Sequence, residues 1–199
     1  MITHLDKKTH VSLTKPIDRL HRIADQEQAA PITATAPIPA QISDPVTPTN
    51  VKITPQTTFG SATDVKPLRV GSVILFLQRA GRKLREYAYQ FDTDSFVAPN
   101  MNVLADHITE SGVLELAYQQ EPSQIVWAPR TDGVLTGMTY ERTEEVVGWH
   151  RHTIGGGVVE SAVTIPHWDG DQDVLWLIVR RTIDGASVRY VEYVEKYMT

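Results

Sequence analysis

Two histidines, His150 and His152, are separated by one residue in the stretch VVGWHRHTIGGG. In a β-strand they would point to the same face, and imidazole is the commonest protein metal ligand. A metal site needs a third and a fourth ligand, and the candidates are His107, His167 and scattered carboxylates. His150 and His152 are therefore metal candidates, but we favour a structural role in which Trp149 fills the core on one strand face while the histidines line the opposite face or a subunit contact.

A second pattern with metal chemistry is the run Asp169-Gly170-Asp171-Gln172-Asp173, whose alternating aspartates imitate a calcium loop. An EF-hand needs glycine at its sixth position and glutamate at its twelfth, and here these positions hold Val174 and Arg180. A solvated hairpin turn is the favoured interpretation.

Patterns for catalysis are incomplete. Glu141, Glu144 and Glu145 cluster near a predicted strand end, but no second acid stands in a defined place for glycoside cleavage. The chain lacks Gly-x-Ser-x-Gly, and no Gly-Lys-Ser/Thr follows its three consecutive glycines. With zero cysteines, thiolate chemistry and disulfides are excluded as well. We expect a protein that is not an enzyme and has no cofactor.

Four basic residues surround one predicted hairpin and could touch an interface or DNA phosphates: Arg79, Arg82, Lys83 and Arg85. Residues 1–60 carry 6 basic and 5 acidic groups, and residues 61–199 carry 13 and 19, so the two parts have net charges of +1 and −6. An acidic region repels DNA rather than capturing it. We therefore expect these cations to pair with Glu86 and neighbouring acids at a subunit surface.

The elements that would position these residues are mainly β-strands. Segments rich in Val, Ile, Trp and Tyr, bounded by turn residues, predict nine strands, at 72–78, 84–91, 113–119, 125–129, 134–140, 145–152, 158–165, 174–181 and 187–194. Asp-Gly pairs at Asp132-Gly133 and Asp184-Gly185 are typical of hairpins. Asn100 could cap one short inserted helix over 101–111. The fold class is mainly β, an antiparallel meander.

Composition divides the chain into three parts. Residues 1–30 form a tail with a possible short helix, residues 31–60 a proline-rich extended arm, and residues 61–199 the antiparallel β domain. Six prolines fall between Pro31 and Pro55. The sequence has no apolar run of the roughly 18–20 residues that a membrane helix needs, so we expect no membrane insertion.

The number, length and spacing of the predicted strands match those of β-propeller blades. Four consecutive short strands between residues 113 and 152 have the size of one blade, and nine strands make about two. Two blades cannot close a ring, so unpaired edges are expected to meet other subunits. A compact sandwich remains the alternative.

The order and spacing of several motifs resemble the tail nozzle proteins of short-tailed bacteriophages and prophages, which are tail tubular protein B-like structural proteins. The resemblance covers roughly residues 46–197, and its motifs are PTNV, QTTFGS, FLQRAGRKLRE, LADHI, AYQQEP, IVW, LTGMTYER, VGWHRH, VRRT and VRYVE. Family members are longer than this chain. The chain could therefore be a truncated or prophage-remnant form of such a protein.

The resemblance implies a non-enzymatic virion protein made in the bacterial host cytoplasm. It implies a homo-oligomeric ring that contacts other phage tail or portal-adaptor proteins, while DNA passes through without specific binding. The alternative from the residues themselves is a carbohydrate-binding or carbohydrate-cleaving β module on the tail. That module would use Trp127, Trp149 and Trp168 as stacking platforms.

Overall fold

The structure is a computed structural model that describes residues 2–4 and 57–195. Apart from strand β1 (Ile2–His4), the predicted tail at 1–30 lies outside the described residues, as does almost all of the predicted arm at 31–60. The predicted β domain at 61–199 lies within them except for its last four residues.

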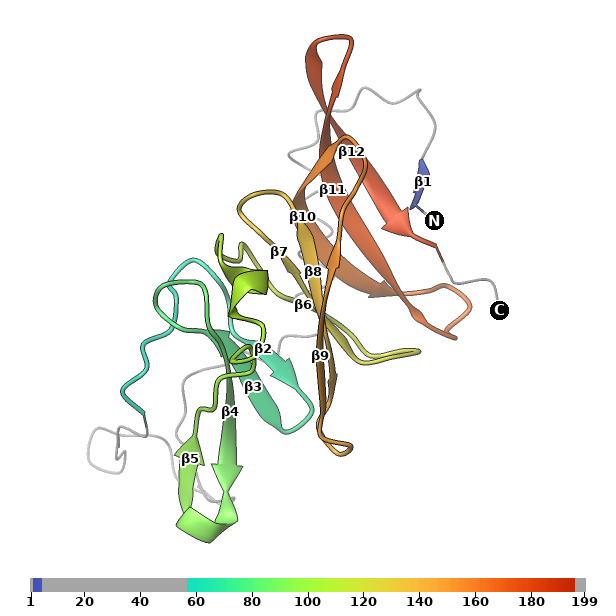
Figure 1. Ribbon diagram of the computed structural model, residues 1–199. Helices are drawn as coiled ribbons and strands as arrows, with labels where there is room; N and C mark the ends of the chain where they lie inside the picture. Colours follow the sequence, from blue (N-terminus) through green and yellow to red (C-terminus); the bar gives the residue numbers. More distant parts are fainter. Residues whose placement is uncertain (1, 5–56, 196–199) are drawn as a thin grey trace, which may run out of the picture.

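Three four-stranded antiparallel sheets make up the fold (Figure 1). The first sheet runs β2–β3–β4–β5, with bounds Leu68–Val70, Val73–Leu77, Leu84–Gln90 and Ser95–Val97. The second sheet runs β6–β7–β8–β9, with bounds Ala117–Gln119, Ile125–Pro129, Leu135–Glu141 and Val146–His152. The third sheet runs β1–β12–β11–β10, with β10 at Gly157–Pro166, β11 at Asp173–Ile183 and β12 at Ala186–Val194.

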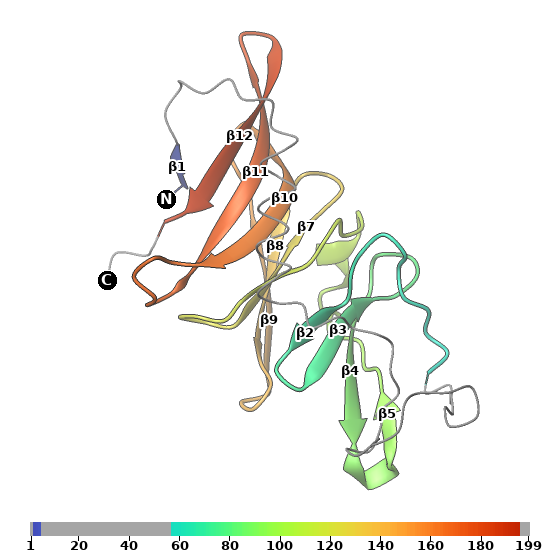
Figure 2. The same ribbon diagram turned by 180° about the vertical axis from the view of Figure 1, so that it is seen from behind.

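The second sheet lies between the other two, as both views of the ribbon show (Figure 2). Alternate side chains of its strands enter different cores because side chains alternate between the faces of a strand. Val126 and Met138 join the core shared with the first sheet. Trp127 and Leu135 join the core shared with the third sheet. This explains why the central strands are apolar on both faces, as strands covered on two sides must be.

One close approach fixes the turn between β7 and β8 against β10. Gly133 has φ +84°, and a Cβ built there would lie 2.3 Å from Val158 Cγ1. The Gly133 carbonyl accepts a hydrogen bond from the Val159 N–H at 2.9 Å. Only glycine combines this backbone conformation with so little space, so the Asp-Gly hairpin signal also serves the packing of the second sheet on the third.

The mainly β, antiparallel-meander class is confirmed, and the nine predicted strands all occur. The sequence predicted nine strands, enough for about two four-stranded blades. The structure adds β1, β2 and β5, and the twelve strands form three four-stranded sheets. These added strands have only three residues each, which gives too short a pattern to detect. The described strands do not close into a ring.

The helix predicted over 101–111 is wrong in extent. The chain forms turns and then one 3₁₀-helix, η2, at Asp106–Thr109; a second short one, η1, spans Phe91–Thr93. Asn100 does cap a turn, since its Oδ1 accepts from the Asn102 N–H at 3.2 Å. The fully buried Asn102 then bonds the Leu84 N–H, the Arg82 carbonyl and Thr109 Oγ1. These tertiary bonds hold the segment to the first sheet, which overrides its helical pattern.

Within the described part of the chain, no helix has the length and apolar character required to cross a bilayer.

Candidate functional site

His150 and His152, the histidine pair, share one face of β9 as the period of two predicts. Their rings are hydrogen-bonded to each other, with Nδ1 of His150 and Nε2 of His152 2.7 Å apart. Both rings lie edge-on or tilted against the buried Trp127, with centroids 5.5 and 5.2 Å away. The pair is therefore packed beside the core between the second and third sheets, and it is only half buried.

Gly137 on β8 makes room for this arrangement. It is paired in register with His150, and a Cβ added there would lie 2.2 Å from His150 Cε1. On the other face of β9, Trp149 packs against the core shared with the first sheet and donates from Nε1 to the Met101 carbonyl at 3.0 Å. The expected division of faces between Trp149 and the histidines is thus what the structure shows.

Burial lowers the pKa of His150, and the neighbouring His152 lowers it further. Burial also lowers the pKa of His152. Each ring therefore holds a proton less readily than an ordinary histidine, because a charged imidazolium here would lose water and face a second ring. Among the described residues, no group of three or more His, Cys, Asp or Glu side chains is placed to hold a metal ion.

The basic residues of the first-sheet hairpin were predicted to pair with Glu86, and the structure shows a different arrangement. Arg85 instead donates from Nε to Gln78 Oε1 at 2.8 Å and from Nη1 to the Ala98 carbonyl at 2.6 Å. Its guanidinium lies 3.4 Å from the centroid of the Phe59 ring. Arg79, Arg82 and Lys83 are exposed on the same hairpin. The expectation failed because Glu86 points into the molecule, where it has other partners.

A buried polar network joins the first sheet to the second. Glu86 is 7% exposed, and its Oε2 accepts from the Tyr140 hydroxyl at 2.5 Å. Its Oε1 accepts from Nε of Arg142 at 3.0 Å. Burial and the bond to Glu86 raise the pKa of Tyr140, and the same carboxylate raises the pKa of Arg142. The carboxylate is therefore satisfied at both oxygens, which a buried charge requires.

The third sheet carries two further ion-pair groups. Glu192, 1% exposed, receives two bonds from Arg181 at 2.7 and 2.9 Å. Glu160 receives bonds from Arg189 at 2.5 Å and from Arg180 at 2.7 Å, and these bonds lower its pKa, that from Arg189 most. Both carboxylates are hydrogen-bonded to arginines, so their negative charges are compensated. These bonds also link strands of the third sheet.

The three tryptophans proposed as a sugar platform are not brought together. Trp127 is buried at 5% exposure, and Trp149 packs on a different core. Trp168 is 87% exposed on the turn between β10 and β11, where its ring is tilted by 33° against that of His167 with centroids 3.7 Å apart. That turn also holds the predicted aspartate run, and Asp169 and Asp171 lie 3.4 and 3.6 Å from His167 Nδ1.

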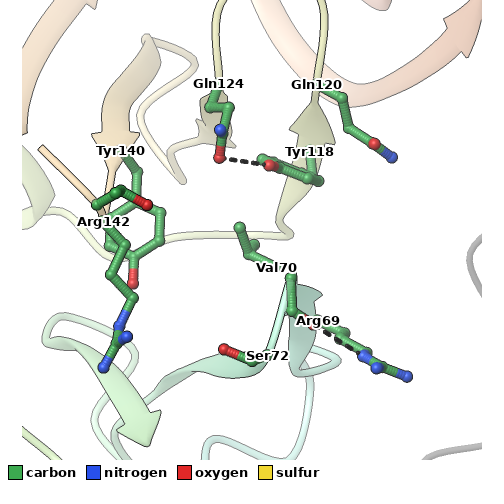
Figure 3. Close-up of a pocket in the computed structure, with 10 residues that line it drawn as sticks. Arg69, Val70, Ser72, Tyr118, Gln120, Gln124, Tyr140 and Arg142 are labelled. Atoms are coloured by element: carbon green, nitrogen blue, oxygen red, sulfur yellow. Dashed lines mark hydrogen bonds between the residues drawn. The ribbon is translucent and has the colours of Figure 1, made fainter.

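Two hollows that were not predicted from the sequence lie where the second sheet meets other parts of the chain, one beside the first sheet and one beside residues 100–108. The first, the polar cleft, is open toward solvent and has a volume of about 610 Å³ (Figure 3). It is lined by Arg69, Val70, Gly71, Ser72, Tyr118, Gln120, Gln124, Tyr140, Arg142 and Thr143. These residues come from β2 and the turn after it, from β6 and the loop after it, and from the end of β8 and the turn after it. Because three distant segments build it, no local motif could have revealed it.

The second hollow, the apolar groove, has a volume of about 410 Å³. It is lined by Asn100, Met101, Val103, Leu104, Ala105, His107, Ile108, Val147 and Trp149. Leu104 is 97% exposed, Val103 69% and Val147 43%. Contiguous exposed apolar side chains are a feature of protein contact surfaces.

Comparison of the sequence with models of known protein families and with curated proteins finds no match.

Proposed function

We propose that this chain is a non-enzymatic structural protein of a phage tail, a nozzle or tube component that self-assembles into a conduit for genome ejection. The apolar groove is the observation that carries the assembly part of the proposal. Its side chains Val103 and Leu104 are exposed without cover from the described residues. The motifs over residues 46–197 that resemble tail nozzle proteins support the phage assignment.

The edges of the sheets support assembly as well. Strand β9 is an edge strand of the second sheet, and its residues Val146 and Val147 are 45% and 43% exposed. An edge strand offers unpaired backbone N–H and C=O groups that another strand can bind. Here this edge runs beside the apolar groove, which Val147 and Trp149 help to line. A neighbouring subunit could therefore bury apolar surface and pair backbone groups at one place.

The chemistry of the charged residues supports a structural role. The carboxylates of Glu86, Glu160 and Glu192 all receive arginine hydrogen bonds. The histidine pair bonds to itself and packs on Trp127. The net charge of −5 is consistent with a surface past which DNA can slide without being captured.

Sedimentation velocity across micromolar concentrations tests the assembly. We expect the wild-type chain to associate, and Leu104→Asp to remain monomeric because a carboxylate in the groove would lose its water on contact. Ile183→Asp is the matched control, since Ile183 is also an exposed apolar residue but lies outside the groove. A wild-type chain that stays a compact monomer, or equal loss of association in both variants, would contradict the proposed contact.

A further inference from the structure

We propose that the polar cleft binds an acidic saccharide, through guanidinium contacts to its carboxylates and hydroxyl and amide contacts to its sugar hydroxyls. This goes beyond the structural function and uses a different surface from the apolar groove. The two hollows share no lining residue.

The size and lining of the cleft define the class of ligand. Its volume of about 610 Å³ lies within the range of about 300–1,000 Å³ usual for small-ligand sites. Both tyrosines of the lining are almost fully buried, Tyr118 at 8% and Tyr140 at 2% exposure. They form walls but offer little apolar area for stacking. The accessible chemistry is therefore that of hydrogen-bonding groups, which favours a polar, hydroxylated ligand over an apolar one.

Two arginines, Arg69 and Arg142, line the cleft, and none of its lining residues in the described part of the chain is acidic. Two carboxylates lie behind the lining, where Glu86 binds Arg142 and Glu141 binds Gln124. Arg142 is held at Nε by Glu86, and Arg69 is held at Nε by the Gly71 carbonyl at 3.1 Å. These bonds engage the inner nitrogen, Nε, of each guanidinium. Two terminal amino groups match the two oxygens of a carboxylate.

The positions of the arginines favour a ligand with more than one charge. Arg69 comes from β2 of the first sheet and Arg142 from the turn that follows β8, and they lie on opposite sides of the cleft (Figure 3). A single small anion would meet one of them. A saccharide of repeating uronic acid units carries carboxylates at intervals with hydroxyls between them, so it can meet both arginines and the groups between.

The polar groups between the arginines include one that is already oriented. Gln124 accepts from the Tyr118 hydroxyl at 2.8 Å and donates from Nε2 to Glu141 Oε2 at 2.9 Å. Its amide is thus fixed before any ligand arrives, which lowers the entropy lost on binding. Ser72 and Thr143 add hydroxyl groups to the lining. This mixture of hydroxyl, amide and guanidinium groups distinguishes a saccharide site from a simple anion site.

The test is isothermal titration of the full chain with a trimer of galacturonic acid at low ionic strength. Neutral cellotriose, sodium phosphate and a short polyglutamate peptide are titrated in parallel. We expect the acidic trimer to bind at least about tenfold more tightly than each of the other three, and added salt to weaken it, because the contacts are ionic and solvent-accessible. No binding, or equal binding of cellotriose, phosphate or polyglutamate, would overturn the assignment.

Variants locate the site. Arg69→Gln should weaken binding about tenfold, the usual scale for one lost charge-assisted contact. The matched control is Arg79→Gln, an exposed arginine outside the cleft, which should bind as the wild type does. Among residues 2–4 and 57–195, Arg69 bonds the Gly71 carbonyl of its own turn. An unchanged thermal melt therefore separates lost binding from lost folding. Equal effects of both variants would remove the cleft as the site.

The titration is repeated on Leu104→Asp, whose groove contact is disabled. Saccharide binding should survive there, so a failure of assembly and a failure of saccharide binding give different results.

Discussion

Replacing Gly137 with alanine tests whether the histidine pair is held by packing. The added Cβ would lie 2.2 Å from Cε1 and 2.9 Å from both ring nitrogens of His150. The ring cannot retreat freely, because His152 binds it on one side and Trp127 packs against it. Overpacking of this kind costs about 1–3 kcal/mol. Alanine in a strand recovers about 0.5–1 kcal/mol relative to glycine, so the net loss is smaller.

A matched glycine on the partner strand serves as a control for the gain in strand propensity. Gly148 lies on β9, and a Cβ there would have nothing within 4 Å. The difference between Gly137→Ala and Gly148→Ala should therefore be about 1–3 kcal/mol in the free energy of unfolding, since strand propensity cancels between them. Urea titration at pH 7.5 measures both.

A double variant tests whether contact with His150 causes the loss of stability in Gly137→Ala. Adding His150→Ala to Gly137→Ala should recover most of the difference, which a double-mutant cycle reports as a favourable coupling. Gly137→Ala as stable as Gly148→Ala, or a loss that His150→Ala does not relieve, would refute the packing argument.

Three further predictions concern the polar groups. Tyr140→Phe removes one of the two partners of the buried Glu86 and should cost about 1–3 kcal/mol by urea titration, whereas Tyr89→Phe, whose hydroxyl bonds an exposed carboxylate, should cost under about 0.5 kcal/mol. The lowered pKa values of the histidine pair mean that its contribution to stability is complete above the ordinary pKa of about 6.5 and is lost as pH falls through the folded values. The urea midpoint should therefore drop between pH 7.5 and 5, and drop less in a variant with alanine at both positions. EDTA should leave the melting temperature unchanged, since metal at 100 times its dissociation constant would contribute about 2.7 kcal/mol; a marked fall that disappears in His150→Ala would reverse the structural interpretation of the pair.

The strands could be predicted because their signals are local. The predicted bounds 125–129 coincide with β7, and the other eight predicted strands overlap observed ones, since β-branched runs and Asp-Gly turns act within a few residues. The helix over 101–111 failed for a non-local reason. Asn102 bonds groups 18 and 20 residues away, and nothing in the segment itself indicates those partners.

For the histidine pair, the sequence pattern predicts the strand face but not the residues that surround the rings. Period two correctly placed both rings on one face, but the reason for the pairing is Gly137 on the neighbouring strand and Trp127 beyond it. Glu86 was expected to pair with nearby basic residues and instead meets Arg142, 56 residues away. The polar cleft combines segments near residues 70, 120 and 141, so only the packing of the first sheet on the second creates it.

We propose that the chain is a structural part of a phage tail. The direct measurement is immunogold electron microscopy of purified particles from cells that express a tagged chain together with the phage genes that accompany it. We predict label concentrated at the tail, in several copies per particle. Intact tailed particles without label, from cells in which the tagged chain is present and soluble, would contradict this role in the tail.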